Sequence, residues 1–116
     1  MKKDNLKFSN FIVSKGATIK DAMASMNDNK KGTVIVVDDK FRVLGTVSDG
    51  DIRRSVVKGR DILSCVDEIM NLNPWSARHG ELEKRQAEEI FKKDLSIRLI
   101  PVVDCANKLV DVIMRV

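Results

Sequence analysis

The spacing of hydrophobic residues changes several times along this chain of 116 residues, and each change predicts an element of secondary structure. An unbroken β-branched run over 33–37 indicates a strand buried on both faces, and 41–48 reads as its partner in a hairpin. Apolar residues at three- and four-residue spacing after Thr18 predict an amphipathic helix with Thr18 as its N-cap. The elements expected in the first half are a strand over 8–13, a helix over 19–29, strands over 33–37 and 41–48, and a helix over 49–58 with Ile52, Val56 and Val57 facing inward.

The same series of elements begins again after Pro74. The elements expected in the second half are an extended piece over 75–77, a helix marked by Leu82, Ala87, Ile90 and Phe91, and strands over 97–103 and 109–116. Because Pro101 lacks an amide N–H, the strand that contains it is expected at a sheet edge.

The two halves form an internal repeat. An offset of 66 residues places Val36-Val37-Asp38 on Val102-Val103-Asp104. Gly16 falls on Gly80 at an offset of 64, which locates a two-residue slip in the helix-to-strand region. Copies of about sixty residues are too small to be stable separately, so they should pack as a pseudo-symmetric pair. The predicted division is a first repeat over 1–60, a connector over 61–72 and a second repeat over 73–116.

Composition excludes several classes of protein. Hydrophobic residues make up 43% of the chain and charged residues 33%, as in soluble globular proteins. The net charge of +4 is spread along the chain and aromatic residues reach only 4%, so nucleic-acid binding is unlikely on this evidence. The absence of a long apolar segment and of a signal-peptide pattern predicts a cytoplasmic protein with no membrane association. Cys65 and Cys105 lack metal-ligand spacing, so free thiols and no metal site are expected.

The segment 44–54 carries the chemistry on which the functional interpretation depends. It runs from a predicted strand into a helix N-terminus, where unpaired backbone N–H groups and the helix dipole favour an anion over Ser48 to Gly50. Asp51 would then accept hydrogen bonds from hydroxyl groups such as those of a ribose, and Arg53 or Arg54 would neutralise a phosphate. An alternative stays open, because Ser48-x-x-Asp51 also fits a helix capping pair that needs no ligand.

The chain resembles a pair of cystathionine-β-synthase-type (CBS) domains, also called a Bateman module. The resemblance covers about residues 11–116 and is carried by Val34-Ile35-Val36-Val37-Asp38, Gly45-Thr46-Val47-Ser48-Asp49-Gly50-Asp51 and Ile97-Arg98-Leu99-Ile100-Pro101-Val102-Val103-Asp104. It implies a mixed α/β (α+β) fold of two β-α-β-β-α repeats packed sheet to sheet. The final helix of the second repeat is missing, which suggests an excised piece or natural fragment of a longer protein.

Membership of this family implies a ligand in the cleft between the repeats. The ligand would be an adenosine nucleotide or a related molecule, such as AMP, ADP, ATP or S-adenosylmethionine. The residues implied for the site are Thr46, Ser48, Asp49, Asp51, Arg53 and Arg54 from the first repeat, and Trp75, Ile97, Arg98 and Leu99 from the second. A weaker second site would use Thr18, Thr33 and Ile35, and it is expected to be degenerate because Asp111 and Met114 replace the glycine and the hydroxyl of the motif.

Two functional hypotheses follow. The first is a non-catalytic, nucleotide-sensing regulatory module, since no nucleophile, oriented base or metal-ligand cluster can be assembled from these residues. The wording of 46–54 is similar to CBS pairs that precede sugar-phosphate nucleotidyltransferase domains, so such a domain is the expected attached partner. The second is a structural or dimerisation module without ligand. Either form is expected to be a homodimer, because apolar positions such as Val56, Val57 and Ile69 lie on short helices.

Overall fold

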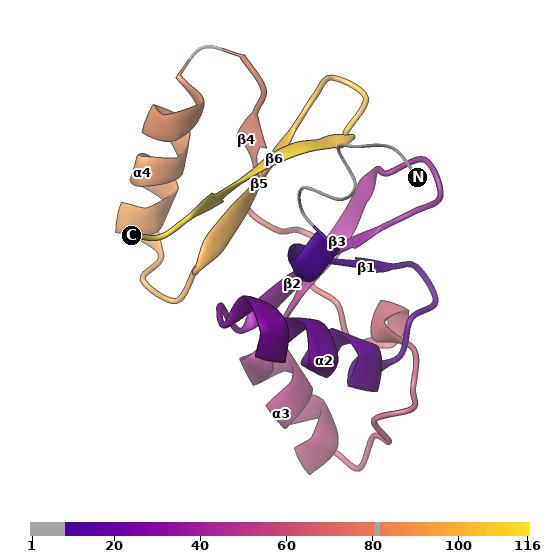
Figure 1. Ribbon diagram of the computed structural model, residues 1–116. Helices are drawn as coiled ribbons and strands as arrows, with labels where there is room; N and C mark the ends of the chain where they lie inside the picture. Colours follow the sequence, from indigo (N-terminus) through magenta and orange to yellow (C-terminus); the bar gives the residue numbers. More distant parts are fainter. Residues whose placement is uncertain (1–8, 81) are drawn as a thin grey trace.

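The computed structural model describes residues 9–80 and 82–116, which form two three-stranded sheets flanked by helices (Figure 1). The first half contains η1 (Ser9–Phe11), β1 (Ile12–Ser14), α2 (Ile19–Asn29), β2 (Thr33–Val37), β3 (Val43–Ser48) and α3 (Asp49–Val57). The second half contains η2 (Val66–Glu68), β4 (Ala77–Arg78), α4 (Glu83–Lys93), β5 (Leu99–Val103) and β6 (Leu109–Met114). In each sheet the central strand pairs parallel with the strand before the helix and antiparallel with the strand after the turn.

The predicted internal repeat is confirmed by the positions of the elements. The strands β5 and β6 begin and end 66 residues after β2 and β3, whereas α4 begins and ends 64 residues after α2. The two extra residues of the second half therefore lie in the loop 94–98, which replaces the three-residue connection 30–32. A β-bulge also recurs at the same offset, between Val36 and Val37 and between Val102 and Val103.

The two sheets pack face to face, and alternating side chains of the central strands divide the core. Val34 and Val36 of β2 face α2 and α3, whereas Ile35 and Val37 point toward Leu99 of the second sheet. In the second half, Ile100 and Val102 pack beneath Ala87 and Ile90 of α4. A strand with both faces covered explains why the run over 33–37 is continuously apolar.

The hairpin turns of the two sheets join at one end of the molecule. The amide of Val43 donates to the carbonyl of Asn107, and the amide of Leu109 donates to that of Phe41, both over 3.0 Å. The side-chain amide of Asn107 adds a third bond to the carbonyl of Val43 over 2.8 Å. These paired bonds obey the same pseudo-symmetry as the strands and fix the two sheets to each other.

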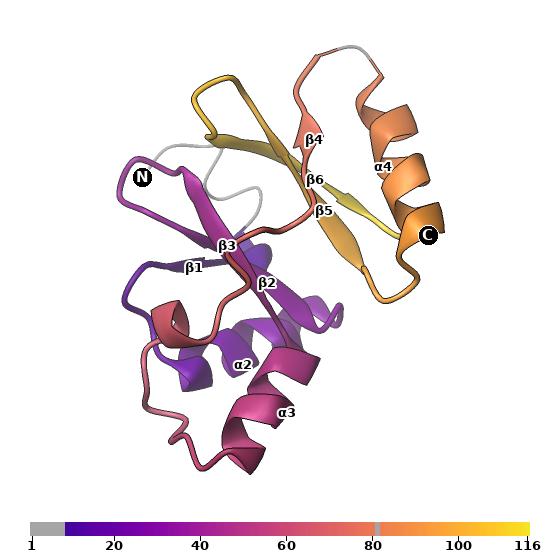
Figure 2. The same ribbon diagram turned by 180° about the vertical axis from the view of Figure 1, so that it is seen from behind.

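The segment 61–72, predicted as a connector, is bound to the first half. Figure 2 shows the chain after α3 returning along the first sheet before it crosses to β4. Val66 is completely buried in the first core, and the amides and carbonyls of Thr46 and Asn71 exchange two hydrogen bonds. Gly45 permits this approach, since a Cβ there would lie 2.5 Å from the carbonyl oxygen of Asn71.

Two expectations about individual positions are wrong. Val56 and Val57 are 46% and 81% exposed, because the inner face of α3 is formed by Ile52 and Ser55. The buried Ser55 hydroxyl is satisfied by the carbonyl of Ile52 at 2.7 Å. Pro101 lies on the central strand β5 rather than at an edge, but β4 pairs only with the two residues after it, so the missing N–H removes no bond on that side.

No helix within residues 9–80 and 82–116 combines the length and apolar character needed to cross a membrane.

Candidate functional site

A cavity of about 500 Å³ lies between the two halves, at the end of the sheets opposite the joined hairpin turns. The first half contributes the start of β2, the end of β3 and the first turn of α3, and the second half contributes the loop 94–98 and the start of β5. The cavity is lined by all ten residues implied for the main site, which are Thr46, Ser48, Asp49, Asp51, Arg53, Arg54, Trp75, Ile97, Arg98 and Leu99. The fold thus gathers on one cavity residues up to 53 positions apart in sequence.

At the start of α3, Ser48 and Asp51 form a complete capping box. The amide of Asp51 donates to Ser48 Oγ over 3.1 Å, and the amide of Ser48 donates to Asp51 Oδ2 over 2.9 Å. Arg54 Nη2 reaches the other carboxylate oxygen, Oδ1, over 2.8 Å. The capping alternative is therefore confirmed as structure. It does not use up the carboxylate, which is 23% exposed and has about four acceptor positions.

Arg54 folds back over the first turn of α3. A Cβ on Gly50 would lie 3.1 Å from Arg54 Nη1, so glycine at this position leaves room for the guanidinium. The Asp51–Arg54 pair consequently covers the helix N-terminus, and Arg54 contributes to two neighbouring cavities.

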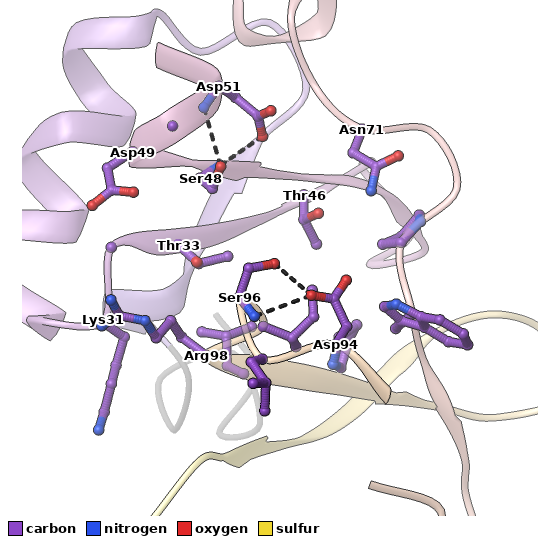
Figure 3. A pocket seen from close by; sticks show the side chains of 18 of the residues that line it. Lys31, Thr33, Thr46, Ser48, Asp49, Asp51, Asn71, Asp94, Ser96 and Arg98 are labelled. Carbon is purple, nitrogen blue, oxygen red and sulfur yellow. Dashed lines mark hydrogen bonds between the residues drawn. The ribbon is translucent and has the colours of Figure 1, made fainter. Parts of the chain in front are cut away.

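Other cations around the cavity have no carboxylate partner. Lys31, Arg53 and Arg98 line the cavity, and none of them forms a salt bridge with any residue in 9–80 or 82–116. In Figure 3, Lys31 lies at one end of the cavity and Asn71 toward the other. Unpaired cations facing a cavity favour an anionic ligand group, and phosphate is the usual one for such a set.

Asp94 and Ser96 are cavity residues that the sequence reasoning missed. Asp94 Oδ1 accepts from the backbone amide and the hydroxyl of Ser96 over 3.0 and 2.6 Å (Figure 3). These two donors, the indole N–H of Trp75 and the charge of Arg115 together hold the pKa of Asp94 below its usual range, against a smaller effect of burial. The two-residue slip was the signal for this loop, since extra residues at one of two equivalent positions mark a place where the repeats differ.

The three residues of the weaker second site are not brought together. Thr33 lines the main cavity, whereas Thr18 caps α2 in a box with Asp21 and Ile35 is completely buried between the sheets. Ile35 therefore contributes its side chain to the core. Thr33 instead adds a hydroxyl to the main cavity.

A family model described as "CBS domain" matches residues 6–58. The chain is a CBS-domain protein. Its fold is that of a CBS pair: a CBS-domain protein of Pyrobaculum aerophilum, solved in complex with AMP, superposes with a TM-score of 0.75 at 24% identity over 89% of this chain and 78% of that one. The CBS pair of protein MJ0100, solved with 5'-methylthioadenosine and S-adenosyl-L-methionine, gives 0.73 at 19% identity over 90% and 80%.

Curated relatives of this CBS-domain chain are longer proteins. An uncharacterized protein of Helicobacter pylori strain J99 is 31% identical over 112 residues, which cover 96% of this chain and 34% of that protein. Arabinose 5-phosphate isomerase GutQ of Escherichia coli O6:H1 is 34% identical over 93 residues, which cover 80% and 28%. The chain thus spans about a third of the length of the relatives that it matches.

Proposed function

We propose that this CBS pair is a non-catalytic regulatory module that binds an adenosine nucleotide or a related ligand in the cavity between its halves. The observation that carries the proposal is the unpaired set of Lys31, Arg53 and Arg98 around a cavity that also presents hydroxyls and carboxylates. A nucleotide offers the complementary groups: an anionic phosphate, ribose hydroxyls that donate to carboxylates, and an apolar base.

The positions of these groups suggest how a nucleotide lies in the cavity. Phosphates would meet Lys31 and Arg98 at one end, and the ribose would meet Asp51 beside the α3 N-terminus (Figure 3). The base would lie against Trp75, which is 43% exposed. Neighbours of this fold solved with AMP or S-adenosyl-L-methionine support the choice of an adenosine ligand.

The signal would pass to an attached domain in a longer cytoplasmic protein. The nucleotidyltransferase association stays a prediction from the 46–54 motif, and the name of the GutQ relatives adds a second candidate, a sugar-phosphate isomerase domain. A homodimer would cover apolar side chains left exposed on the helical side of the first half. These are Met23, Val56, Val57 and Leu63.

A thermal-shift series with adenosine, AMP, ADP, ATP and S-adenosylmethionine tests the proposal. A ligand at about a hundred times its dissociation constant stabilises the folded state by roughly 2.7 kcal/mol, which for a chain of this size raises Tm by on the order of 10 °C. Inorganic phosphate at equal concentration controls for general anion effects. If no nucleotide shifts Tm beyond the phosphate control, the alternative of a ligand-free structural or dimerisation module is correct.

A further inference from the structure

The loop 94–98 is the part of the cavity wall that has no counterpart in the other half. It contains two more residues than the connection 30–32, and Asp94, Leu95, Ser96, Ile97 and Arg98 all line the cavity. Within it, Asp94 is fixed by two bonds from Ser96 to a single carboxylate oxygen. The second oxygen is left for a group outside the loop.

We propose that Asp94 is a positioning residue that orients the indole of Trp75 as a stacking platform for the base of the ligand. Trp75 comes from the chain just before β4, lines the same cavity and carries no secondary structure of its own. The inference rests on the proposed nucleotide site and adds a specific part for one carboxylate in it.

The physical argument starts from the exposure of Trp75. An indole that is 43% exposed on an irregular segment has little packing to select one side-chain rotamer. Its only polar atom is the Nε1–H donor, so an acceptor fixed beside the cavity orients the ring at that edge and leaves the faces free. The lowered pKa of Asp94, to which the Trp75 N–H contributes, keeps this acceptor ionised at neutral pH.

Pre-orientation of an aromatic side chain has a consequence for ligand choice. Stacking is open to any planar base and is worth about 1–3 kcal/mol per base, so the Trp75–Asp94 pair would serve the base and not the phosphate. Loss of Asp94 should then weaken adenosine and ATP equally. Loss of Arg98 should weaken ATP far more than adenosine.

Intrinsic fluorescence reads the pair directly, because the chain contains one tryptophan and no tyrosine. Without ligand, Asp94→Ala should shift Trp75 emission to the red and raise its quenching by acrylamide, whereas Asp94→Asn, which keeps an oxygen acceptor, should retain most of the wild-type signal. Asp104→Ala is the matched control, since Asp104 makes the same type of turn through the amides of Ala106 and Lys108. An Asp94→Ala protein with wild-type emission and quenching would overturn the inference.

Adding adenosine and ATP separates this inference from the proposed function. Both ligands should quench Trp75, and Asp94→Ala should lower both affinities by about tenfold relative to Asp104→Ala. If calorimetry detects nucleotide binding while Trp75 fluorescence is unchanged, the platform is wrong and the nucleotide site stands. If calorimetry detects no binding of either ligand, both the site and its platform are wrong.

Discussion

Ser48 and Asp51 exchange two hydrogen bonds across the first turn of α3, each side-chain oxygen accepting from the other residue's amide. The same exchange occurs between Thr18 and Asp21 at the start of α2, away from the cavity. A capping carboxylate and a cavity-lining carboxylate can therefore be compared within one protein. The pair allows structural and ligand-binding parts of the motif to be measured separately.

Asp51→Ala is expected to lower both apo stability and nucleotide affinity. Loss of the cap costs about 1 kcal/mol or less in the free energy of unfolding, and loss of hydrogen bonds to ribose weakens binding about ten- to a hundredfold. Asp21→Ala removes the equivalent cap on α2 and should leave affinity unchanged. Denaturant unfolding and calorimetry on both variants check this. Wild-type affinity in Asp51→Ala would remove that residue from the site.

Arg98→Ala is expected to weaken ligands in proportion to their phosphate charge. The Arg98 guanidinium has no carboxylate partner in the described part of the chain, so its removal breaks no ion pair and should leave Tm nearly unchanged. Affinity for ATP should fall more than tenfold and affinity for adenosine should not change. Arg85→Ala, on the exposed face of α4, is the control. Equal losses for both ligands would contradict a phosphate contact.

Gly45→Ala is expected to destabilise the protein, whereas Gly50→Ala is not. The new Cβ at position 45 would meet the Asn71 carbonyl oxygen, a backbone atom, and such overpacking costs about 1–3 kcal/mol. At position 50 it would meet only the flexible end of Arg54. Urea unfolding of the two variants measures the difference. Equal stability of the two would show that the segment 61–72 can move away from β3.

Val57→Asp is expected to shift a homodimer toward the monomer. Val57 is 81% exposed on α3, so the change should leave the folded subunit intact while placing a charge in an apolar contact. Leu82→Asp, at a 62% exposed site beside α4, is the control. Sedimentation velocity at tens of micromolar distinguishes the states. A wild-type monomer at that concentration would refute dimerisation, and a dimer that survives Val57→Asp would place the interface elsewhere.

Stability should be flat near neutral pH and fall in acid. The backbone amide of Gly16 donates to Asp67 over 3.0 Å and, as the largest cause, holds the pKa of Asp67 below its usual value. A lowered folded-state pKa stabilises the protein above the unfolded value of about 3.9, and this contribution disappears as pH falls through the folded value. Tm should therefore be constant from about pH 5 to 8 and drop below about pH 4. Asp67→Asn should show a shallower acid limb than the exposed control Asp39→Asn.

The repeat was predictable because its strands carry the same short pattern twice. Val36-Val37-Asp38 and Val102-Val103-Asp104 both end a central strand at a bulge, so a fixed offset finds equivalent positions. The cavity lining was predictable for the same reason, once the motif at 45–51 had been placed at a helix start. Both inferences used local sequence that codes for local structure.

Tertiary contacts determined what the pattern could not. Val56 follows Ile52 at helical spacing and looked internal, but only packing reveals that Ser55 lies on the inner face instead. Asp94 looked like an ordinary helix-ending residue, and its place in the cavity depends on how the second sheet faces the first. Pro101 suggested an edge because the length of β4 was unknown.

The joined hairpin turns give the molecule the mechanics of tweezers. Backbone bonds between Val43 and Asn107 and between Leu109 and Phe41 act as the pivot, and the cavity lies between the tips. A molecule grasped by both tips alters the angle of the arms without breaking the pivot. Since α3 and α4 ride on separate arms, a small change in grip becomes a larger displacement at their outer surfaces.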